Sequence, residues 1–261
     1  MQYALATVYG PTPVEECIVR CERIAARVEG DRQSEGIMSF VLGQLEAMRG
    51  NFERGRELYR RAHATFEELR LQVDAATVSL SSGHIERLAG DVAAAERELR
   101  RGYDELTRLG ERYLLSSVTG YLAEAVVAQG RLDEAEALAQ ETAELAGEDD
   151  VDAQMLWRLT RARVCALRGE LEDARSLSSE AVRLVEPTDD LVNKANAYAC
   201  HAWVLALAGR EHNARDFLQQ ARAFAAEKGS PVMVARVDEL GAELAHLSVQ
   251  APAPVKAPDP V

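Results

Sequence analysis

The sequence repeats a glycine at a nearly constant interval, and this regularity constrains the fold more than any other feature. The glycines are Gly10, Gly50, Gly90, Gly130, Gly169 and Gly209. Successive members of the set are separated by 40, 40, 40, 39 and 40 residues. Unrelated turns would not keep a constant interval, so one structural unit is used repeatedly. Each glycine lies between two helix-forming stretches, where a left-handed residue can end the first helix, and the unit is therefore predicted to be a helical hairpin.

Small residues occupy matching places in every predicted hairpin. Seven residues before the glycines from Gly50 onward stand Gly43, Gly83, Ala123, Ala162 and Ala202. Five residues after the same glycines stand Gly55, Ala95, Ala135, Ala174 and Ala214. Twelve residues after them stand Ala62, Gly102, Thr142, Ala181 and Ala221. Paired helices can approach closely at such positions. A heptad coiled coil is disfavoured, because the glycines interrupt any long seam.

The small residues and the loop together form a pattern typical of one repeat family. The clearest unit reads Gly43-x6-Gly50-Asn51-Phe52-x2-Gly55-x3-Tyr59-x2-Ala62. This unit resembles the tetratricopeptide repeat (TPR). The resemblance implies an all-α fold, a right-handed α-α superhelix of about five hairpins. The family's repeat is shorter than the interval found here, which implies longer helices, and Glu211 replaces the usual apolar residue at the start of the last second helix.

The repeat divides the chain into four predicted segments. Residues 1–30 form a partial N-terminal repeat, residues 31–229 the five hairpins, residues 230–248 a C-terminal capping helix, and residues 249–261 a disordered tail rich in proline and alanine. Thr12, Pro13 and Glu15 predict a capped helix start just after Gly10. Only half of a first helix precedes that start, so we expect the solenoid to be a fragment of a longer protein.

Composition excludes several classes of partner. The chain has 43 acidic and 30 basic side chains and a formal net charge of -13, which repels phosphate backbones and anionic lipid surfaces. We therefore expect no nucleic-acid or membrane partner. The first ten residues lack the pattern of a secretory signal, and a cytoplasmic location is expected.

The four cysteines lie in apolar, helix-forming surroundings. They are Cys17, Cys21, Cys165 and Cys200. Their setting favours reduced core thiols, while the spacing of the first two, four apart on one helical face, leaves a disulfide or metal role open.

The first helices of stacked hairpins line the concave face, so exposed side chains there are the expected ligand contacts. The predicted partner-binding residues are Gln44, His84, Arg87, Glu124, Arg163, Asn196 and Trp203. Flanking positions such as Ile37, Thr77 and Ser117 would widen the groove. The resulting prediction is a scaffold that binds a partner protein or peptide.

Two other interpretations of this row stay open. Polar side chains on a helix surface often serve only solvation. A small-molecule or peptide sensor is the alternative function, and it requires a defined pocket around Trp203, Arg163 and Glu124 in place of an open trough.

Nothing in the sequence predicts an enzyme. Ser81, Ser82, His84 and Glu86 are close in the chain, but neighbours on one helix point around its circumference and do not converge as a nucleophile and its base must. The phosphate-binding patterns G-x-x-x-x-G-K-[ST] and G-x-G-x-x-G and the zinc pattern H-E-x-x-H do not occur. The sequence thus predicts no catalytic residue, no cofactor and no metal.

Three segments resemble the C-terminal repeat regions of bacterial multidomain signalling ATPases, including cyclase–ATPase fusions and large LuxR-type regulators. The segments are residues 9–17, 43–50 and 130–135. The resemblance implies a regulatory role and an intramolecular contact with an ATPase or output domain placed before this segment. The ATPase and cyclase motifs themselves are not in this sequence, so neither activity is expected of the chain.

Overall fold

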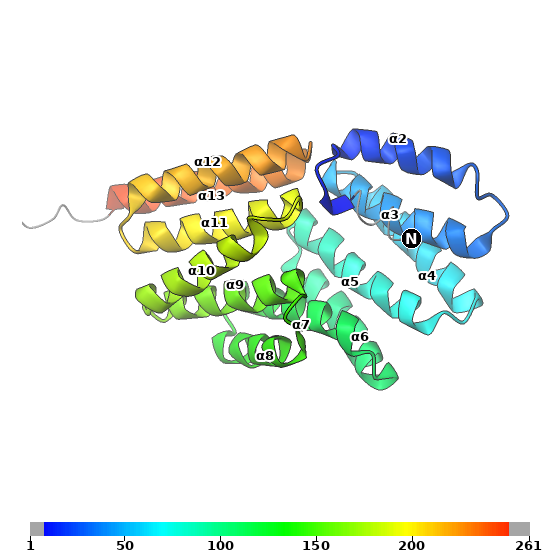
Figure 1. The fold of residues 1–261 in the computed structure, drawn as a ribbon, viewed down its shortest axis with the longest axis horizontal. Helices are drawn as coiled ribbons and strands as arrows, with labels where there is room; N and C mark the ends of the chain where they lie inside the picture. The colour runs from blue at the N-terminus through cyan, green and yellow to red at the C-terminus, as the bar shows by residue number, and fades with distance from the viewer. Residues whose placement is uncertain (1–7, 251–261) are drawn as a thin grey trace, which may run out of the picture.

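The computed structural model describes residues 8–250, with side chains up to residue 246, and within this range it contains helices and no strand (Figure 1). The helices are α2 (Val14–Ala25), α3 (Arg32–Met48), α4 (Phe52–Glu68), α5 (Gln72–Ala89), α6 (Val92–Leu109), α7 (Arg112–Val127), α8 (Leu132–Leu145), α9 (Val151–Leu167), α10 (Leu171–Val185), α11 (Leu191–Leu207), α12 (Glu211–Glu227) and α13 (Pro231–Gln250). Residues 1–7 of the predicted partial repeat and residues 251–261 of the predicted tail lie outside the described residues.

Consecutive helices pair as five antiparallel hairpins, from α3 with α4 to α11 with α12. The prediction of an all-α solenoid of helical hairpins is therefore confirmed. The loop glycines from Gly50 to Gly209 have φ values between +71° and +98°, the left-handed conformation expected of a residue that ends a helix. Gly10 is not among the positive-φ glycines.

The small residues allow the two helices of a hairpin to touch. Gly43 and Gly55 face each other in the first hairpin, where a Cβ atom at Gly55 would lie 2.9 Å from the carbonyl oxygen of Gly43. A Cβ atom at Gly83 would lie 2.5 Å from Leu99 Cγ in the second hairpin. In the third and fourth hairpins Ala123, Ala135, Ala162 and Ala174 fill the matching positions and are fully buried. The small residues at the predicted matching places are thus where the two helices of each hairpin touch.

The substitution Gly55→Ala tests this contact. Alanine is the better helix former by about 1 kcal/mol, but its methyl group would press on the Gly43 backbone, which cannot rotate away. We expect a net loss of about 1–2 kcal/mol in the free energy of unfolding, measured by chemical denaturation. The control is Gly147→Ala in the loop before α9, where the nearest atom is the flexible Asp149 Oδ1, and it should change stability by less than about 0.5 kcal/mol. A Gly55→Ala variant as stable as the wild type would contradict the close packing.

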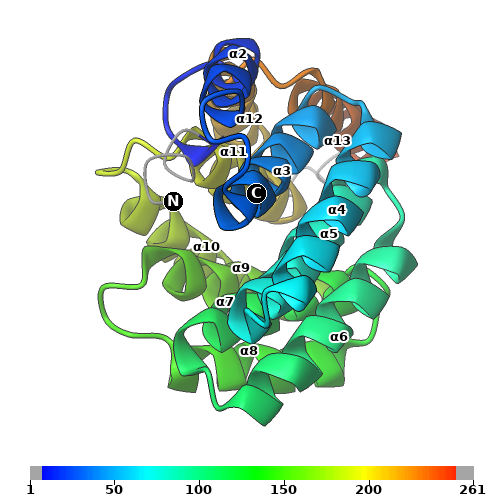
Figure 2. The same cartoon turned by 90° about the vertical axis from the view of Figure 1, so that its right-hand side faces the viewer.

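The two ends of the solenoid meet, which the sequence did not predict. Lys228, between α12 and α13, is completely buried, and its Nζ donates hydrogen bonds to the carbonyl oxygens of Gly10 and Thr12, each 2.9 Å away. The backbone N–H of Val14 donates to the Lys228 carbonyl at 2.9 Å, and Ser230 Oγ donates to the Met48 carbonyl at 2.7 Å. Figure 2 shows the result: the helices follow one another around a centre, and α13 returns beside α3.

This closure corrects two expectations. The first helices do not line an open groove; they surround an interior whose remaining space is enclosed by both ends of the chain. The predicted cap of α2 by Thr12 is also wrong, because helix α2 begins at Val14 with no side-chain cap. The carbonyl of Lys228, supplied by the far end of the chain, satisfies the first free N–H of that helix.

The hydrophobic core also joins the two ends of the solenoid. One cluster contains Val14 and Cys17 from α2, Val41 from α3, and Val192 and Met233 from the C-terminal helices. Residues separated by most of the sequence thus share one core. All four cysteine thiols are buried, in agreement with the interpretation as core residues.

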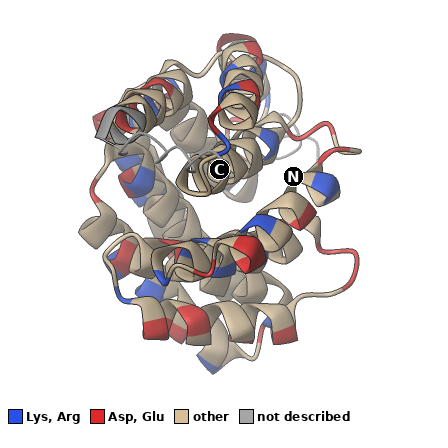
Figure 3. Cartoon of the chain, turned by 90° about the vertical axis from the view of Figure 1, so that its left-hand side faces the viewer, with Lys and Arg blue, Asp and Glu red and all other residues tan. Residues whose placement is uncertain are grey.

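The outer faces carry charges of both signs along the helices (Figure 3). Arg56 contacts Glu86 on the next hairpin at 2.6 Å, and Arg131 contacts Glu96 at 2.8 Å. Such pairs at a protein surface contribute only about 0–1 kcal/mol each, so they adjust the stacking of hairpins and do not drive it. Within the described range, no helix is both long and apolar enough to pass through a bilayer.

Candidate functional site

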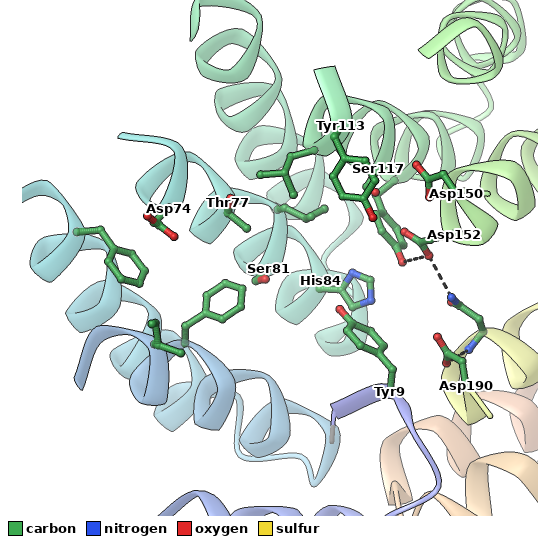
Figure 4. A pocket seen from close by; sticks show the side chains of 17 residues that line it. Tyr9, Asp74, Thr77, Ser81, His84, Tyr113, Ser117, Asp150, Asp152 and Asp190 are labelled. Atoms are coloured by element: carbon green, nitrogen blue, oxygen red, sulfur yellow. Dashed lines mark hydrogen bonds between the residues drawn. The ribbon is translucent and has the colours of Figure 1, made fainter. Parts of the chain in front are cut away.

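The interior of the ring contains a cavity of about 300 Å³, which we call the tyrosine–carboxylate cavity. Its lining residues are Tyr9, Ile37, Phe40, Phe66, Asp74, Thr77, Leu80, Ser81, His84, Tyr113, Leu114, Ser117, Tyr121, Asp150, Asp152, Asp190 and Asn193. These residues come from the first helices of all five hairpins, from α4 and from the segment before α2. Figure 4 shows the labelled side chains around this space. Apolar side chains and tyrosine rings stand among the carboxylates.

The carboxylates gather here because of how the first helices begin. Asp150 and Asp190 precede α9 and α11, where their side chains accept hydrogen bonds from the N–H groups of Ala153 and Asn193 at 3.2 and 2.8 Å. Acidic residues are preferred at such helix starts, since they satisfy free N–H groups and the positive end of the helix dipole. The starts of α9 and α11 both open on this cavity, so two capping carboxylates come to line one space.

Asp152 links the walls of the cavity through side-chain hydrogen bonds. Its Oδ1 accepts hydrogen bonds from Tyr121 OH at 3.0 Å and from Asn193 Nδ2 at 3.1 Å, as the dashed lines in Figure 4 show. Burial raises the pKa of Asp152 to about 6, against the effect of these two donors and with added repulsion from Asp190 and Asp150. Burial likewise raises the pKa of Asp190 to about 6. The cavity therefore holds carboxylates whose charge is costly to maintain at neutral pH.

Aromatic rings form the rest of the polar wall. Tyr121 is buried and meets the His84 ring edge-on, with 4.6 Å between ring centroids. Tyr113 is 69% exposed and stands at the mouth of the cavity. Burial, followed by repulsion from Arg87 and Arg236, holds the pKa of His84 well below its ordinary value, so its imidazole is neutral.

One acceptor in the cavity has no partner within the protein. Asn193 is only 6% exposed, and its Oδ1 accepts no hydrogen bond although its Nδ2 donates to Asp152. The neighbouring carboxylates of Asp152 and Asp190 match a ligand that brings N–H donors and positive charge. Over the described part of the chain, no group of three or more His, Cys, Asp or Glu side chains has an arrangement that could hold a metal ion. The chemistry of the lining therefore fits an organic cation.

A second cavity, of about 220 Å³, lies on the other side of His84, and we call it the arginine cavity. Its lining residues are Met48, His84, Arg87, Leu88, Arg163, Val192, Ala195, Asn196, Ala199, Met233, Arg236, Val237 and Leu240. His84 lines both cavities, so its ring forms part of the wall between them.

Six of the seven residues predicted to bind a partner lie in this interior. His84, Arg87, Arg163 and Asn196 line the arginine cavity. Glu124 is 7% exposed and accepts a hydrogen bond from Arg163 Nη1 at 3.1 Å.

The sixth of these residues, Gln44, is 1% exposed, and its Nε2 donates to Tyr9 OH at 3.1 Å. The structure thus gathers these residues as buried or half-buried walls and supports and not as an exposed row.

Trp203 is separate from the other predicted residues. It lines neither cavity and packs against the apolar cluster of Cys165, Ala166, Ala174 and Val204, between the fourth and fifth hairpins. The predicted pocket around Trp203, Arg163 and Glu124 therefore keeps only the last two as neighbours.

Comparison with known proteins agrees with this geometry. A tetratricopeptide repeat family model matches residues 117–141 and 156–178, which include parts of the third and fourth hairpins. The fold is a TPR-like solenoid. The described repeats are longer than the matched segments, because each first and second helix extends for 14 to 18 residues.

Several solved structures share this TPR-like solenoid at low sequence identity. BtubC (BKLC) from P. vanneervenii is 14% identical, with a TM-score of 0.57 over 95% of this chain and 94% of that chain. Aspartyl phosphate phosphatase F from Bacillus subtilis is 12% identical, with a TM-score of 0.54, and the match covers 86% of this chain and 61% of that one. A structure of nearly identical TPR-like repeats from Podosopora anserina is 16% identical, with a TM-score of 0.50 over 75% and 96% of the two chains. No curated protein matches the sequence.

The cluster of Ser81, His84 and Glu86 behaves in the TPR-like solenoid as its helical spacing predicts. Ser81 and His84 face the tyrosine–carboxylate cavity, whereas Glu86 points to the outer face and is bound by Arg56. Glu86 therefore does not join Ser81 and His84 at the cavity.

Sequence reasoning missed the carboxylates and tyrosines of the first cavity. A usable signal existed, since Asp150 and Asp190 stand at the starts of first helices, where capping is the ordinary explanation. That all these starts open on one enclosed space follows only from the closure of the ring.

Proposed function

We propose that this chain is a recognition module that receives the cationic group of a partner, a lysine or arginine side chain or an amino terminus, in the tyrosine–carboxylate cavity. The observation that carries the proposal is the gathering of Asp74, Asp150, Asp152 and Asp190 around one cavity whose lining contains no lysine or arginine. The TPR-like fold supports a role in protein or peptide binding and not in catalysis.

Electrostatics favours a cation over other ligands. Asp74, Asp150, Asp152 and Asp190 line the cavity, and none of the lining residues is a lysine or an arginine. A cation in a site poor in water interacts with such carboxylates more strongly than it would at the surface. A bound cation would also offset the repulsion between Asp152 and Asp190, so both carboxylates could be ionised in the complex.

Aromatic residues give the site a second means of recognition. The ring of Tyr113 lies on the same side of the cavity as Asp152 (Figure 4), and Tyr121 is hydrogen-bonded to Asp152. Ring faces attract lysine and arginine cations, by about 0.5–2 kcal/mol according to how far the pair is desolvated. Tyr113 at the mouth is well placed to contact the chain that leads to the buried cation.

The alternative is a sensor of a small organic amine, and the size of the cavity favours it. A volume of about 300 Å³ is at the lower end of ligand sites and would accommodate a small molecule or a single long side chain, not a folded element. A partner's cationic side chain and a free amine would contact the same carboxylates. They differ only in whether a peptide backbone extends outside the cavity.

Calorimetric titration with matched probes separates these outcomes. We expect an acetylated alanine-based pentapeptide with one central arginine or lysine to bind the chain at least tenfold more tightly than the same peptide with norleucine or glutamate. Butylguanidine and butylamine serve as probes without a peptide backbone. If they bind as tightly as the peptides, the sensor alternative is favoured. Equal affinity for the norleucine and arginine peptides would contradict cation recognition in either form.

We also propose, from the sequence resemblance, that the module serves a larger regulatory protein of the signalling-ATPase type, where ligand binding would bias a neighbouring output domain. The enclosed ring supports this proposal, because a ligand that reaches Tyr9 and Asp190 contacts both ends of the solenoid at once. Such a ligand can couple its binding to the closure of the ring.

A further inference from the structure

The arginine cavity is lined by cationic side chains, whereas the tyrosine–carboxylate cavity is lined by acidic ones. Arg87 from α5, Arg163 from α9 and Arg236 from α13 line it together. Glu124 pairs with Arg163, at 3.1 Å, and leaves Arg87 and Arg236 without a carboxylate among the lining residues. His84, the remaining titratable side chain of the lining, is neutral and adds no charge.

The hydrogen-bonding capacity of these guanidinium groups is not used up within the protein. Arg87 Nε is buried and donates to no acceptor, and Arg87 Nη2 lies 3.3 Å from His84 Nε2. Arg236 Nη1 donates to the carbonyl oxygen of Arg87 at 3.0 Å, a bond that fixes the α13 side chain over the cavity. A guanidinium group carries five N–H donors in a planar fork suited to carboxylate and phosphate oxygens.

The three cations repel one another. Arg236 is exposed, yet desolvation, followed by repulsion from Arg87 and Arg163, lowers its pKa to about 10, and Glu124 and Glu239 offset only part of this effect. An anion between the guanidinium groups would reduce the remaining repulsion.

Most of the other lining residues are apolar. Met48 from α3, Leu88 from α5, and Met233, Val237 and Leu240 from α13 line the same cavity as the cations. An inorganic anion would leave these side chains without a partner, whereas a ligand with a hydrocarbon part would cover them.

We propose that the arginine cavity binds an organic anion whose acidic group, a carboxylate or a phosphate ester, contacts Arg87 and Arg236 while its apolar part packs on Met233 and Leu240. This site is distinct from the tyrosine–carboxylate cavity, and its ligand has the opposite charge. Because α13 supplies Arg236 and both of those apolar residues, the ligand would bind across the junction of α5 and α13 and so hold the ring closed.

Titration of the full chain with six-carbon probes tests the proposal. We expect hexanoate or hexyl phosphate to bind at least tenfold more tightly than hexylamine or hexanol, and the tighter of the two anions identifies the acidic group. Arg87→Met should weaken that anion at least tenfold. Arg236→Gln, which keeps a donor for the Arg87 carbonyl, provides a second variant with the same expectation if Arg87→Met fails to fold.

Two control variants test whether a change in anion affinity arises in the arginine cavity. Arg222→Met removes an exposed arginine that pairs with Asp238 on the outer side of α13, and it should leave anion affinity unchanged. Asp152→Asn should also leave anion affinity unchanged, so a failure of the first cavity as a cation site would not affect this result. Unchanged anion affinity in both Arg87→Met and Arg236→Gln, or hexylamine binding as tight as hexanoate, would overturn the proposal.

Discussion

At pH 7.5 the variant Asp152→Asn is expected to be more stable than the wild-type chain by about 1–3 kcal/mol and to lose at least tenfold in affinity for the arginine peptide. The wild-type pKa of about 6, against an ordinary 3.8, means that the folded protein resists ionisation of this group. Asparagine removes the charge, while its Oδ1 can still accept the hydrogen bonds from Tyr121 and Asn193. Stability gained at the expense of binding is typical of a functional site.

The pH dependence of this difference has a definite sign. Below about pH 4 Asp152 is protonated in both the folded and the unfolded protein, so it contributes no difference. Between about pH 4 and 6 the folded protein holds the proton more tightly, and the wild-type chain loses stability relative to the variant as the pH rises. Above about pH 6 the difference in free energy of unfolding between the variant and the wild-type chain reaches its full value. Asp190 titrates in the same range and is coupled to Asp152, so the two carboxyl groups release their protons as a pair.

Urea denaturation at pH 4.5, 6 and 7.5 measures this effect. Asp104→Asn on the exposed face of α6 is the control, and its stability should follow the wild-type curve within about 0.5 kcal/mol. If Asp152→Asn is less stable than the wild-type chain at pH 7.5, the carboxylate is a structural group and the assignment to binding is wrong.

The variant Lys228→Met is expected to open the ring. Methionine fills a similar volume but leaves the carbonyl oxygens of Gly10 and Thr12 without their donor, at a cost of about 2–4 kcal/mol. Removal of a buried ammonium group offsets part of this cost, since burial lowers the pKa of Lys228 below its ordinary value. The hairpins themselves keep their contacts, so we expect an open solenoid and not an unfolded chain.

Small-angle scattering and hydrogen exchange measure the opening. The radius of gyration should rise, and the amides of α2 and α13 should exchange at least tenfold faster, while those of α7 to α10 keep their protection. Arginine-peptide affinity should also fall, because Tyr9 and Asp190 line the cavity from opposite sides of the junction. Arg97→Met on the exposed face of α6 is the control. A compact Lys228→Met variant with unchanged exchange would show that the junction is held by apolar packing alone.

The repeat itself was readable from the chain because its determinants are local. Glycine at a loop and alanine or glycine at fixed distances from it act within one hairpin, over about 20 residues, and they recur in all five. Helix periodicity and turn chemistry do not depend on where the rest of the chain lies. The structure places four residues of the predicted partner-binding row, Gln44, His84, Glu124 and Arg163, on the inner side of the first helices, and their role in binding stays a prediction.

The prediction of an open groove failed because it depends on the curvature that accumulates over all the repeats. An open groove and a closed ring use the same hairpin, and small differences in the angle between neighbouring repeats decide which one forms. The bonds from Lys228 to Gly10 and Thr12 join residues 218 and 216 positions apart, and neither end of the chain carries a sequence signal for the other.

The sequence by itself therefore determined the helical hairpin, its repetition and the close contact of its two helices, because these depend on short-range sterics and turn conformation. The tertiary structure alone decided that the ring closes, that the helix-capping aspartates share a space with tyrosines, and that three arginines share another. The physical reason is that burial and electrostatic coupling are properties of what surrounds a residue, and for this chain the surroundings come from opposite ends of the sequence.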